Sequence, residues 1–355
     1  MPSPFADRFK SARLRAGFSL QELADRLPFK ISRQALHRYE KGEVIPDSEM
    51  MNALSTALGV RTDYFFREQQ VSLGAIEYRK LKRMPAREEA KIVELTRDYL
   101  SRYLELEEIL GTQTAFENPL EDYPVVSTYE QVNAAAEKVR KVWALGCDPI
   151  YNVAELLEDK FIKVVLLEAD MAFDGLQTWA TAGGVPVPVI AYNEAKLQKS
   201  DRIRFTLLHE LAHLLLQFDE TLSHRQTETL CHQFAAAMLL PESTIRQELG
   251  SHRTRISIEE LGNLKRQYGI SMQAAIMRAR ACGIINEHYT SYLFFYFRQQ
   301  KWNRDEPVEY IGEERSHRFE QLLHRALIEE QISMSKAAAL SNQKLADFKA
   351  QNTVL

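Results

Sequence analysis

The apolar pattern at the start of the chain predicts a set of short helices. Between about residue 4 and residue 67, apolar residues recur at the spacing of a buried helix face, and glycine or proline separates the runs. A longer charged amphipathic segment follows over 76–110, interrupted near Pro85. It suits a spacer between domains, a dimer contact, or a solvated helix that covers a neighbouring core. The recurring apolar positions are Phe9, Leu14, Leu20, Leu23, Ala24, Leu27, Ile31, Leu36 and Tyr39.

The middle of the chain alternates between helix and strand patterns. Residues 129–145 have helical periodicity, and Asp148 followed by Pro149 is typical of a helix start. The apolar run 161–167 predicts a strand, and the Asp-Gly pair within 173–176 predicts a turn.

A second strand and two helices are expected further on. Residues 183–193 predict a strand, which its prolines assign to a sheet edge. Ser200 or Asp201 is expected to cap a helix that carries TLLHELAHLLLQF, and TETLCHQFAAAMLL predicts a second helix that ends at Pro241. The remainder of the chain alternates helical patterns with an aromatic stretch at 292–297, which suits a core or a packed interface.

Composition narrows the class of protein. A chain of 355 residues is expected to form two or three domains, and its net charge of −4 means that any surface for nucleic acid must be local. Three widely separated cysteines, Cys147, Cys231 and Cys282, suit a reducing cytosol rather than a disulfide framework. The N-terminal stretch lacks the apolar region of a secretory signal, and no apolar run is long enough to span a bilayer. We therefore expect a cytoplasmic protein without a membrane partner.

The segment 19–42 has the form of a helix-turn-helix. Ser32 is placed to cap the second helix, which leaves Arg33, Gln34 and His37 on its outward N-terminal side. Arginine bonds guanine edges and glutamine bonds adenine edges in the major groove, so this helix suits base recognition.

Phosphate contacts and local charge support the same interpretation. Gln21, at the start of the first helix, and Arg38 suit contacts to the DNA backbone. Between Asp7 and Glu43 there are nine Lys and Arg against five Asp and Glu, a local net charge of +4 in a net-negative chain. A helical interaction module with an ordinary charged face is the alternative.

The N-terminal segment resembles the XRE family of Cro-like repressors. The resemblance rests on SLQELA, on SRQALHRYEKG and on the tail PDSEMMNALSTALGVRTDYFF, and it covers nearly all of 5–67. It implies binding to an inverted-repeat operator in double-stranded DNA, and it implies a homodimer.

Two histidines and a glutamate lie within one apolar run. His209 and His213 are four residues apart, so on a helix both imidazoles share one face and can reach one zinc ion at about 2.0–2.1 Å. Glu210 is rotated by about 100° from His209, where it can act as the base that takes a proton from a water at the metal. The alternative makes both histidines core residues of a metal-free helical protein.

A catalytic zinc site needs a third protein ligand. A metzincin would place glycine at position 216 and histidine at position 219, where this chain has Leu216 and Asp219, so that class is excluded. Glu228, on the following helix, is the favoured third ligand. His232, one turn beyond it, suits packing, a supporting hydrogen bond, or hydrogen-bond donation in the transition state. The rival ligands Asp219, Glu220 and His224 are expected in a connecting loop.

Residues 145–245 resemble the ImmA/IrrE family of zinc metallopeptidases. The resemblance rests on FDGLQTW, PVIAYN, RIRFTLLHELAHLLL and ETLCHQFAAAMLLP. It implies His209, His213 and Glu228 as zinc ligands and Glu210 as the catalytic base. This chain departs from the family at Ala212, where most members have glycine, and at the tripeptide 230–232 (LCH), where many have Glu-Ala-Asn.

These patterns predict a mainly α protein with a small β-sheet. We expect an all-α helix-turn-helix domain over 1–70, a helical linker over 71–125, an α+β zincin-like domain of the gluzincin type over 126–250, and a helical region of unknown role over 251–355.

The expected function is a DNA-binding regulator fused to a zinc-dependent peptidase. The resemblance implies cleavage of a regulatory partner, such as a repressor or an antitoxin-like protein, in stress responses or toxin–antitoxin systems. The alternative is a non-catalytic repressor or antitoxin whose peptidase-like domain senses metal or binds a partner. If the peptidase is active, the predicted edge strand at Val187–Tyr192 is the expected place for substrate backbone pairing.

Overall fold

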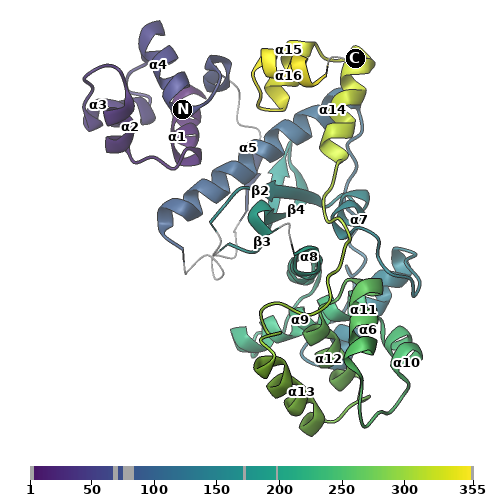
Figure 1. Cartoon of the computed structure of the whole chain (residues 1–355). Helices are drawn as coiled ribbons and strands as arrows, with labels where there is room; N and C mark the ends of the chain where they lie inside the picture. The colour runs from purple at the N-terminus through teal and green to yellow at the C-terminus, as the bar shows by residue number, and fades with distance from the viewer. Residues whose placement is uncertain (1–3, 67–70, 75–83, 171–172, 197–198, 353–355) are drawn as a thin grey trace. The chain divides into compact units, whose positions relative to one another are not determined.

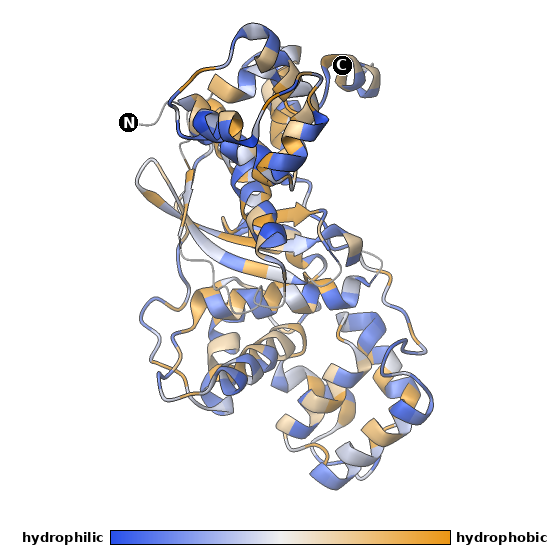
Figure 2. Cartoon of the chain, turned by 90° about the vertical axis from the view of Figure 1, so that its left-hand side faces the viewer, coloured by the Kyte–Doolittle hydropathy of each residue, from blue (hydrophilic) through white to orange (hydrophobic). Residues whose placement is uncertain are grey.

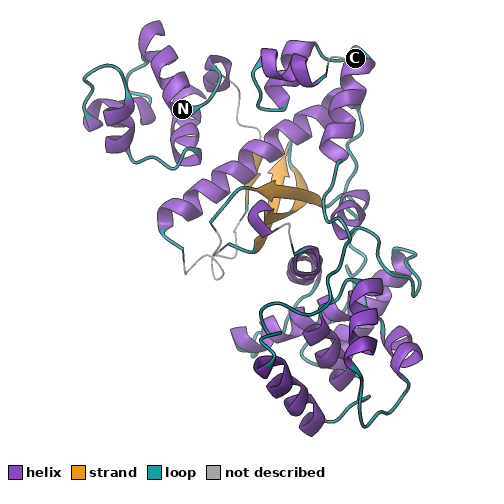
Figure 3. Ribbon diagram, in the orientation of Figure 1, coloured by secondary structure: helices purple, strands orange, loops and turns teal. Residues whose placement is uncertain are grey.

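The computed structural model describes residues 4–66, 71–74, 84–170, 173–196 and 199–352. Helices predominate, and the strands form one small sheet (Figure 3), which confirms the predicted fold class. Among the described residues, no helix is both long enough and apolar enough to cross a membrane. The chain divides into two compact units. The first comprises Met1–Ala115, Thr178–Val187 and His317–Leu355, and the second comprises Phe116–Gln177 and Pro188–Ser316.

Short capped helices form the N-terminal part of the first unit (Figure 1), as the apolar pattern predicts. Ser19, Ser32 and Asp47 each accept a hydrogen bond from the first turn of the helix that follows. The backbone N–H and hydroxyl of Ser19, together with Arg87, lower the pKa of the Glu22 carboxyl to about 2. The elements are α1 (Pro4–Arg15), α2 (Leu20–Arg26), α3 (Arg33–Glu40), α4 (Ser48–Leu58) and the 3-10 helix η1 (Thr62–Phe66).

The long charged helix is α5 (Ala86–Leu110), and the earlier part of the predicted 76–110 segment lies mostly outside the described residues. One face of α5 packs on α1, where Arg15 and Asp98 form an ion pair of 3.0 Å. In the C-terminal half of α5, Tyr103 is buried against Phe319 in an apolar core separate from the one that contains α1. The helix therefore covers neighbouring cores within this unit. Its partners there are α14 (Arg318–Ile328), α15 (Met334–Leu340) and α16 (Leu345–Gln351).

The sheet has the strand order β1-β3-β4-β2. Outer strand β1 is antiparallel to β3, with Val71 opposite Ala182, and outer strand β2 is parallel to β4, with Lys163 opposite Val189. The predicted strand at 161–167 is confirmed as β2. The strands are β1 (Val71–Leu73), β2 (Lys163–Leu167), β3 (Gly175–Ala182) and β4 (Val185–Asn193).

The predicted turn at 173–176 is wrong, because β3 begins at Gly175. A side chain there would place its Cβ 3.0 Å from Thr206 Cγ2 and 3.1 Å from the carbonyl oxygen of Ala191. Glycine at this position thus permits close approach of strand and helix rather than a reversal of the chain.

The predicted edge position of the strand at 183–193 is also wrong. Strand β4 lies between β3 and β2, so Val187–Tyr192 cannot offer the free edge expected for substrate pairing. Its prolines, Pro186 and Pro188, precede the ladder with β2, which starts at Val189. They therefore interrupt none of those hydrogen bonds.

Helices of the second unit enclose one large apolar core. Figure 2 shows hydrophilic and hydrophobic residues mixed along individual helices, as expected where one face is buried. In the aromatic stretch 292–297, Leu293 and Phe297 are buried whereas Tyr292 and Phe295 are exposed. The helices are α6 (Tyr129–Val142), α7 (Val153–Asp159), α8 (Ser200–Leu215), α9 (His224–Leu239), α10 (Glu242–Leu249), α11 (Ile258–Tyr268), α12 (Met272–Ala281) and α13 (Glu287–Gln299).

No helix begins at Asp148 and Pro149, contrary to the prediction. Arg140 on α6 donates hydrogen bonds to the carbonyl oxygens of Gly146 and Asp148, at 2.9 and 2.7 Å, which holds this segment as a loop. The next helix, α7, starts at Val153 and is capped by Asn152.

Two further helix starts differ from the prediction. Helix α8 begins at Ser200 with Lys199 in the capping position and no side-chain cap, so neither Ser200 nor Asp201 is the N-cap. Helix α9 begins at His224, because Ser223 and Gln226 form a capping box. His224 is therefore a helical residue rather than a loop residue.

A buried ion pair ties the start of α8 to the segment after α13. Arg204 and Glu314 lie 2.8 Å apart with fully buried side chains. Glu314 also accepts a hydrogen bond of 2.8 Å from the backbone N–H of Val153, at the first residue of α7. Burial raises the pKa of Glu314 to about 7, and the Arg204 guanidinium opposes this shift.

This raised pKa predicts a pH-dependent stability. Between the unfolded pKa of about 4.3 and the folded pKa of about 7, the native state keeps a proton on Glu314 that the unfolded chain releases. The contribution of Glu314 to the free energy of unfolding is therefore complete below about pH 4.3 and falls by about 4 kcal/mol as the pH rises from there through 7. The change in the free energy of unfolding is measured by urea unfolding at about pH 5 and about pH 7.5. Glu314→Gln should show a smaller pH difference, whereas exposed Glu309→Gln should behave as wild type; equal pH differences in all three would contradict this assignment.

Candidate metal centre and DNA-binding surface

Helices α8 and α9 pack side by side in the second unit. Both are lined by apolar residues with no exposed surface, including Leu207 and Leu211 on α8 and Phe234 and Met238 on α9. Since residues four apart share one helix face, burial of the leucines also fixes which way the neighbouring histidines point. The local sequence thus directs polar side chains of α8 toward α9.

The structure brings His209, His213 and Glu228 together, as the sequence predicts. Nε2 of His209 lies 3.4 Å from Oε2 of Glu228, and Nε2 of His213 lies 3.1 Å from Oε1. The two histidine side chains are 6 % and 7 % exposed, and the carboxylate is 23 % exposed. The Glu228 carboxylate is therefore more exposed to solvent than the two imidazoles, which are almost completely buried.

These separations fit a shared metal ion. Four ligands held at about 2.0–2.1 Å in a tetrahedron lie about 3.3–3.4 Å from one another. The observed nitrogen–oxygen separations of 3.4 and 3.1 Å are close to this value, although each imidazole lies nearest a different oxygen of the Glu228 carboxylate. Nε2 of His213 is buried and, although it lies 3.1 Å from Oε1 of Glu228, it makes no hydrogen bond of acceptable geometry among the described residues. Two imidazoles and a carboxylate are also a donor set that zinc prefers. The residues present thus fit the metal that the sequence predicts.

Glu210 lies on a different side of α8 from the two histidines. The residue is 3 % exposed, and its Cγ is 3.6 Å from the Cβ position that Gly175 leaves empty. Glu210 therefore faces the start of β3 rather than α9. This is the orientation expected of a carboxylate that acts beside a metal centre without binding the metal.

Of the rival ligands, His224 lies at the edge of the cluster that His209, His213 and Glu228 form. His224, in the first turn of α9, has Nδ1 4.0 Å from Oε1 of Glu228 and is exposed. Asp219 accepts two hydrogen bonds from Thr221, which lower the pKa of its carboxyl. Glu220 is exposed. The group of potential metal ligands found among the described residues comprises His209, His213 and Cys231, so it contains none of these three residues and does not contain Glu228. Glu228 is favoured over them because its carboxylate oxygens lie 3.1 and 3.4 Å from the two imidazole nitrogens.

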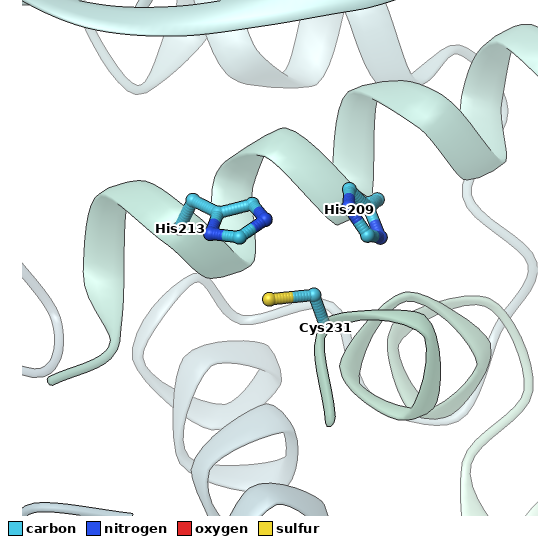
Figure 4. A group of neighbouring side chains, drawn as sticks. All are labelled: His209, His213 and Cys231. Atoms are coloured by element: carbon cyan, nitrogen blue, oxygen red, sulfur yellow. The ribbon is translucent and has the colours of Figure 1, made fainter. Parts of the chain in front are cut away.

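Cys231 belongs to the cluster, which the sequence prediction missed. Its Sγ and the ring nitrogens of His209 and His213 all lie within 4.8 Å of one another. Figure 4 shows its side chain extending from α9 toward the two imidazoles of α8. The signal was present in the sequence, because position 231 is three residues after Glu228 and so shares its helix face.

His232 lies beside His209 and lines a cavity. Its ring centre is 4.5 Å from that of His209, and its ring stacks on that of Phe205 with the centres 5.8 Å apart. The cavity has a volume of about 1000 Å³. Its walls are mainly apolar, and they include Phe205, Met277 and Phe294 together with His232. A cavity of this size beside the cluster can accept a large apolar side chain.

The predicted DNA-reading residues lie on the surface of the first unit. Arg33, Gln34, His37 and Arg38 are exposed on α3. Ser32 is exposed, and its Oγ accepts the N–H of Ala35 as the helix cap.

Phosphate-contacting candidates are exposed as well. Gln21 lies in the first turn of α2 and donates a hydrogen bond of 2.8 Å to Asp25. Arg38 pairs with Glu43 at 3.4 Å, and both side chains are at least half exposed. Exposed pairs of this kind are weak, so a phosphate can replace the partner of Arg38.

Comparisons with known proteins agree with this geometry. Residues 162–280 match the peptidase M78 family, described as the IrrE N-terminal-like domain, and residues 9–65 match the helix-turn-helix family. A Bacillus subtilis (strain 168) protein, described as an SPbeta prophage-derived uncharacterized HTH-type transcriptional regulator YonR, is 40 % identical over 63 residues. That similarity covers 18 % of this chain and 56 % of the relative, so the chain spans about half of the relative's length.

Both resemblances drawn from the sequence are confirmed by these matches. The chain carries an XRE-type helix-turn-helix domain at its N-terminus and, after it, an IrrE/ImmA-like domain of the peptidase M78 family.

Proposed function

We propose that this chain is a DNA-binding transcriptional regulator whose IrrE/ImmA-like domain is a zinc-dependent peptidase. Its substrate is a regulatory partner protein of the repressor or antitoxin type. The observation that carries the proposal is the convergence of His209, His213 and Glu228 within 3.1–3.4 Å, with Glu210 on the adjacent side of the same helix.

The chemistry follows from the positions of these side chains. His209, His213 and Glu228 would hold the zinc ion, which when bound supplies a Lewis acid for the peptide carbonyl and acidifies a water. Glu210 takes the proton of the attacking water and delivers it to the leaving amine nitrogen. The apolar packing around α8 keeps bulk water from competing, which strengthens the charge interactions of Glu210.

The substrate backbone is proposed to pair with the first residues of β3. Strand β1 pairs with Ala180–Ala182, and the N–H of Gly74 bonds the carbonyl oxygen of Trp179 at 2.7 Å. Within the described residues, no strand pairs with Gly175–Gln177 on the side opposite β4. Gly175 lies against Glu210, so a substrate strand there would pass beside the proposed base. This edge replaces Val187–Tyr192 as the place for β-augmentation.

The helix-turn-helix domain is proposed to read an operator in double-stranded DNA. Helix α3 would enter the major groove, where Arg33, Gln34 and His37 contact bases, while Gln21, Ser32 and Arg38 contact phosphates. As an XRE-type domain it is proposed to act as a homodimer on an inverted repeat.

A non-catalytic regulator is the second candidate function. The position of Cys231 favours it, because a fourth protein ligand is typical of closed zinc sites that do no chemistry. In that case the domain would sense metal or bind a partner, and Glu210 would have no proton to move.

Cleavage of a partner is tested by mapping new protein N-termini in cells. Cells that express the wild-type chain should accumulate at least one cleaved protein that is absent when Glu210→Gln is expressed at the same level. The substitution keeps the size of the side chain and removes the base, which is expected to slow hydrolysis by about a hundredfold or more. Identical sets of N-termini in the two strains, measured by N-terminal labelling and mass spectrometry, would rule out the peptidase and leave the non-catalytic regulator.

Operator recognition is tested by selecting binding sites from random duplex DNA. Arg33→Ala should lose about 1–3 kcal/mol of preference at one base pair, because a bidentate contact to that base disappears. Arg38→Ala should weaken binding to all sequences alike and lower the salt dependence by about one ion. Arg61→Ala, an exposed arginine paired with Asp63 beyond α4, is the matched control and should bind as wild type. Unaltered selectivity in Arg33→Ala would remove α3 as the reading helix.

A further inference from the structure

Cys231 and Glu228 lie on one face of α9. They are three residues apart, so their side chains follow each other along the helix, and α9 packs against α8. The two residues nevertheless differ in exposure, since Cys231 is completely buried whereas the Glu228 side chain is 23 % exposed. Sulfur therefore approaches the histidines from the core, and the carboxylate approaches them from the solvent side.

The distances place the sulfur close to a bonding position. In a tetrahedral site with zinc–sulfur bonds of about 2.3 Å and zinc–nitrogen bonds of about 2.0–2.1 Å, sulfur and nitrogen lie about 3.6 Å apart. The Sγ of Cys231 is within 4.8 Å of both imidazoles. The observed sulfur–nitrogen separations therefore exceed the expected value of about 3.6 Å by no more than about 1 Å. A small rotation of the Cys231 side chain moves the sulfur by that distance.

The other two cysteines, Cys147 and Cys282, provide a comparison for Cys231. None of the three cysteines forms a disulfide. Cys282 is buried at the end of α12 beside the hydroxyl of Tyr129 at 3.5 Å, and burial raises the pKa of its thiol. Cys147 is exposed. Neither joins a group of potential metal ligands within the described part of the chain, so proximity to the histidines distinguishes Cys231.

We propose that Cys231 is the fourth protein ligand of the metal centre, completing a set with His209, His213 and Glu228. The inference rests on the metal centre proposed above and adds its regulation. With four protein ligands, no coordination position is left for water. Hydrolysis would therefore proceed only in the fraction of chains in which Cys231 has released its position, and Glu210 would act in that fraction. A thiolate also favours zinc over hard cations such as Mg²⁺.

Cobalt(II) substitution tests the ligand directly, without any assay of activity. Metal-free full-length protein loaded with Co²⁺ should show an intense sulfur-to-cobalt charge-transfer absorption in the near ultraviolet. That absorption should be lost in Cys231→Ala and Cys231→Ser, and it should remain in Cys282→Ala, the matched change of another buried cysteine. Zinc affinity, measured by competition with a chromophoric chelator, should fall at least about tenfold in Cys231→Ala and stay unchanged in Cys282→Ala.

The outcomes separate this inference from the proposed function. One Co²⁺ bound per wild-type chain without the charge-transfer absorption would overturn the role of Cys231 and leave the metal centre intact. Failure of the wild type to bind Co²⁺ or Zn²⁺ would overturn both. If the Cys231 variants fail to fold by circular dichroism, X-ray absorption of the zinc-loaded wild type decides instead. A sulfur neighbour at about 2.3 Å supports the assignment, and a shell of nitrogen and oxygen alone contradicts it.

Discussion

The packing of α8 against α9 is the constraint on which the proposed chemistry depends. Leu207 and Leu211 on one helix and Phe234 and Met238 on the other are fully buried, and burial of each such side chain stabilises the fold by about 2 kcal/mol. That apolar gain offsets the cost of withdrawing imidazole and carboxylate groups from water. The same packing places Nε2 of His213 3.1 Å from Oε1 of Glu228. A metal ion would stabilise the buried polar groups further, because it would bind their ligand atoms directly.

Local patterns predict those features that neighbours in sequence determine. The four-residue spacing of His209 and His213 assigns both to one helix face, and Ser32 caps α3 as expected. The convergence of Glu228 with the histidines was also predicted from the sequence, since it requires only that two successive helices pack together.

Features set by distant contacts were not predictable in the same way. Gly175 belongs to a strand because Thr206 and Ala191 approach it closely, and the loop at 146–150 persists because Arg140 binds its carbonyl groups. Strand β4 is internal although it contains prolines, because pairing with β2 starts only after them. Cys231 was overlooked for another reason: a lone buried cysteine usually behaves as a small hydrophobic residue, and only its distance from two imidazoles distinguishes it.

We propose that one metal ion is held by His209, His213 and Glu228 while Glu210 remains available as a base. The metal content of the purified protein, measured by mass spectrometry, tests this proposal. We expect about one zinc per wild-type chain, strongly reduced in His213→Ala and Glu228→Ala and retained in Glu210→Gln. A wild-type chain that binds no metal after zinc loading would contradict it. The second unit would then be a metal-free domain attached to a helix-turn-helix protein.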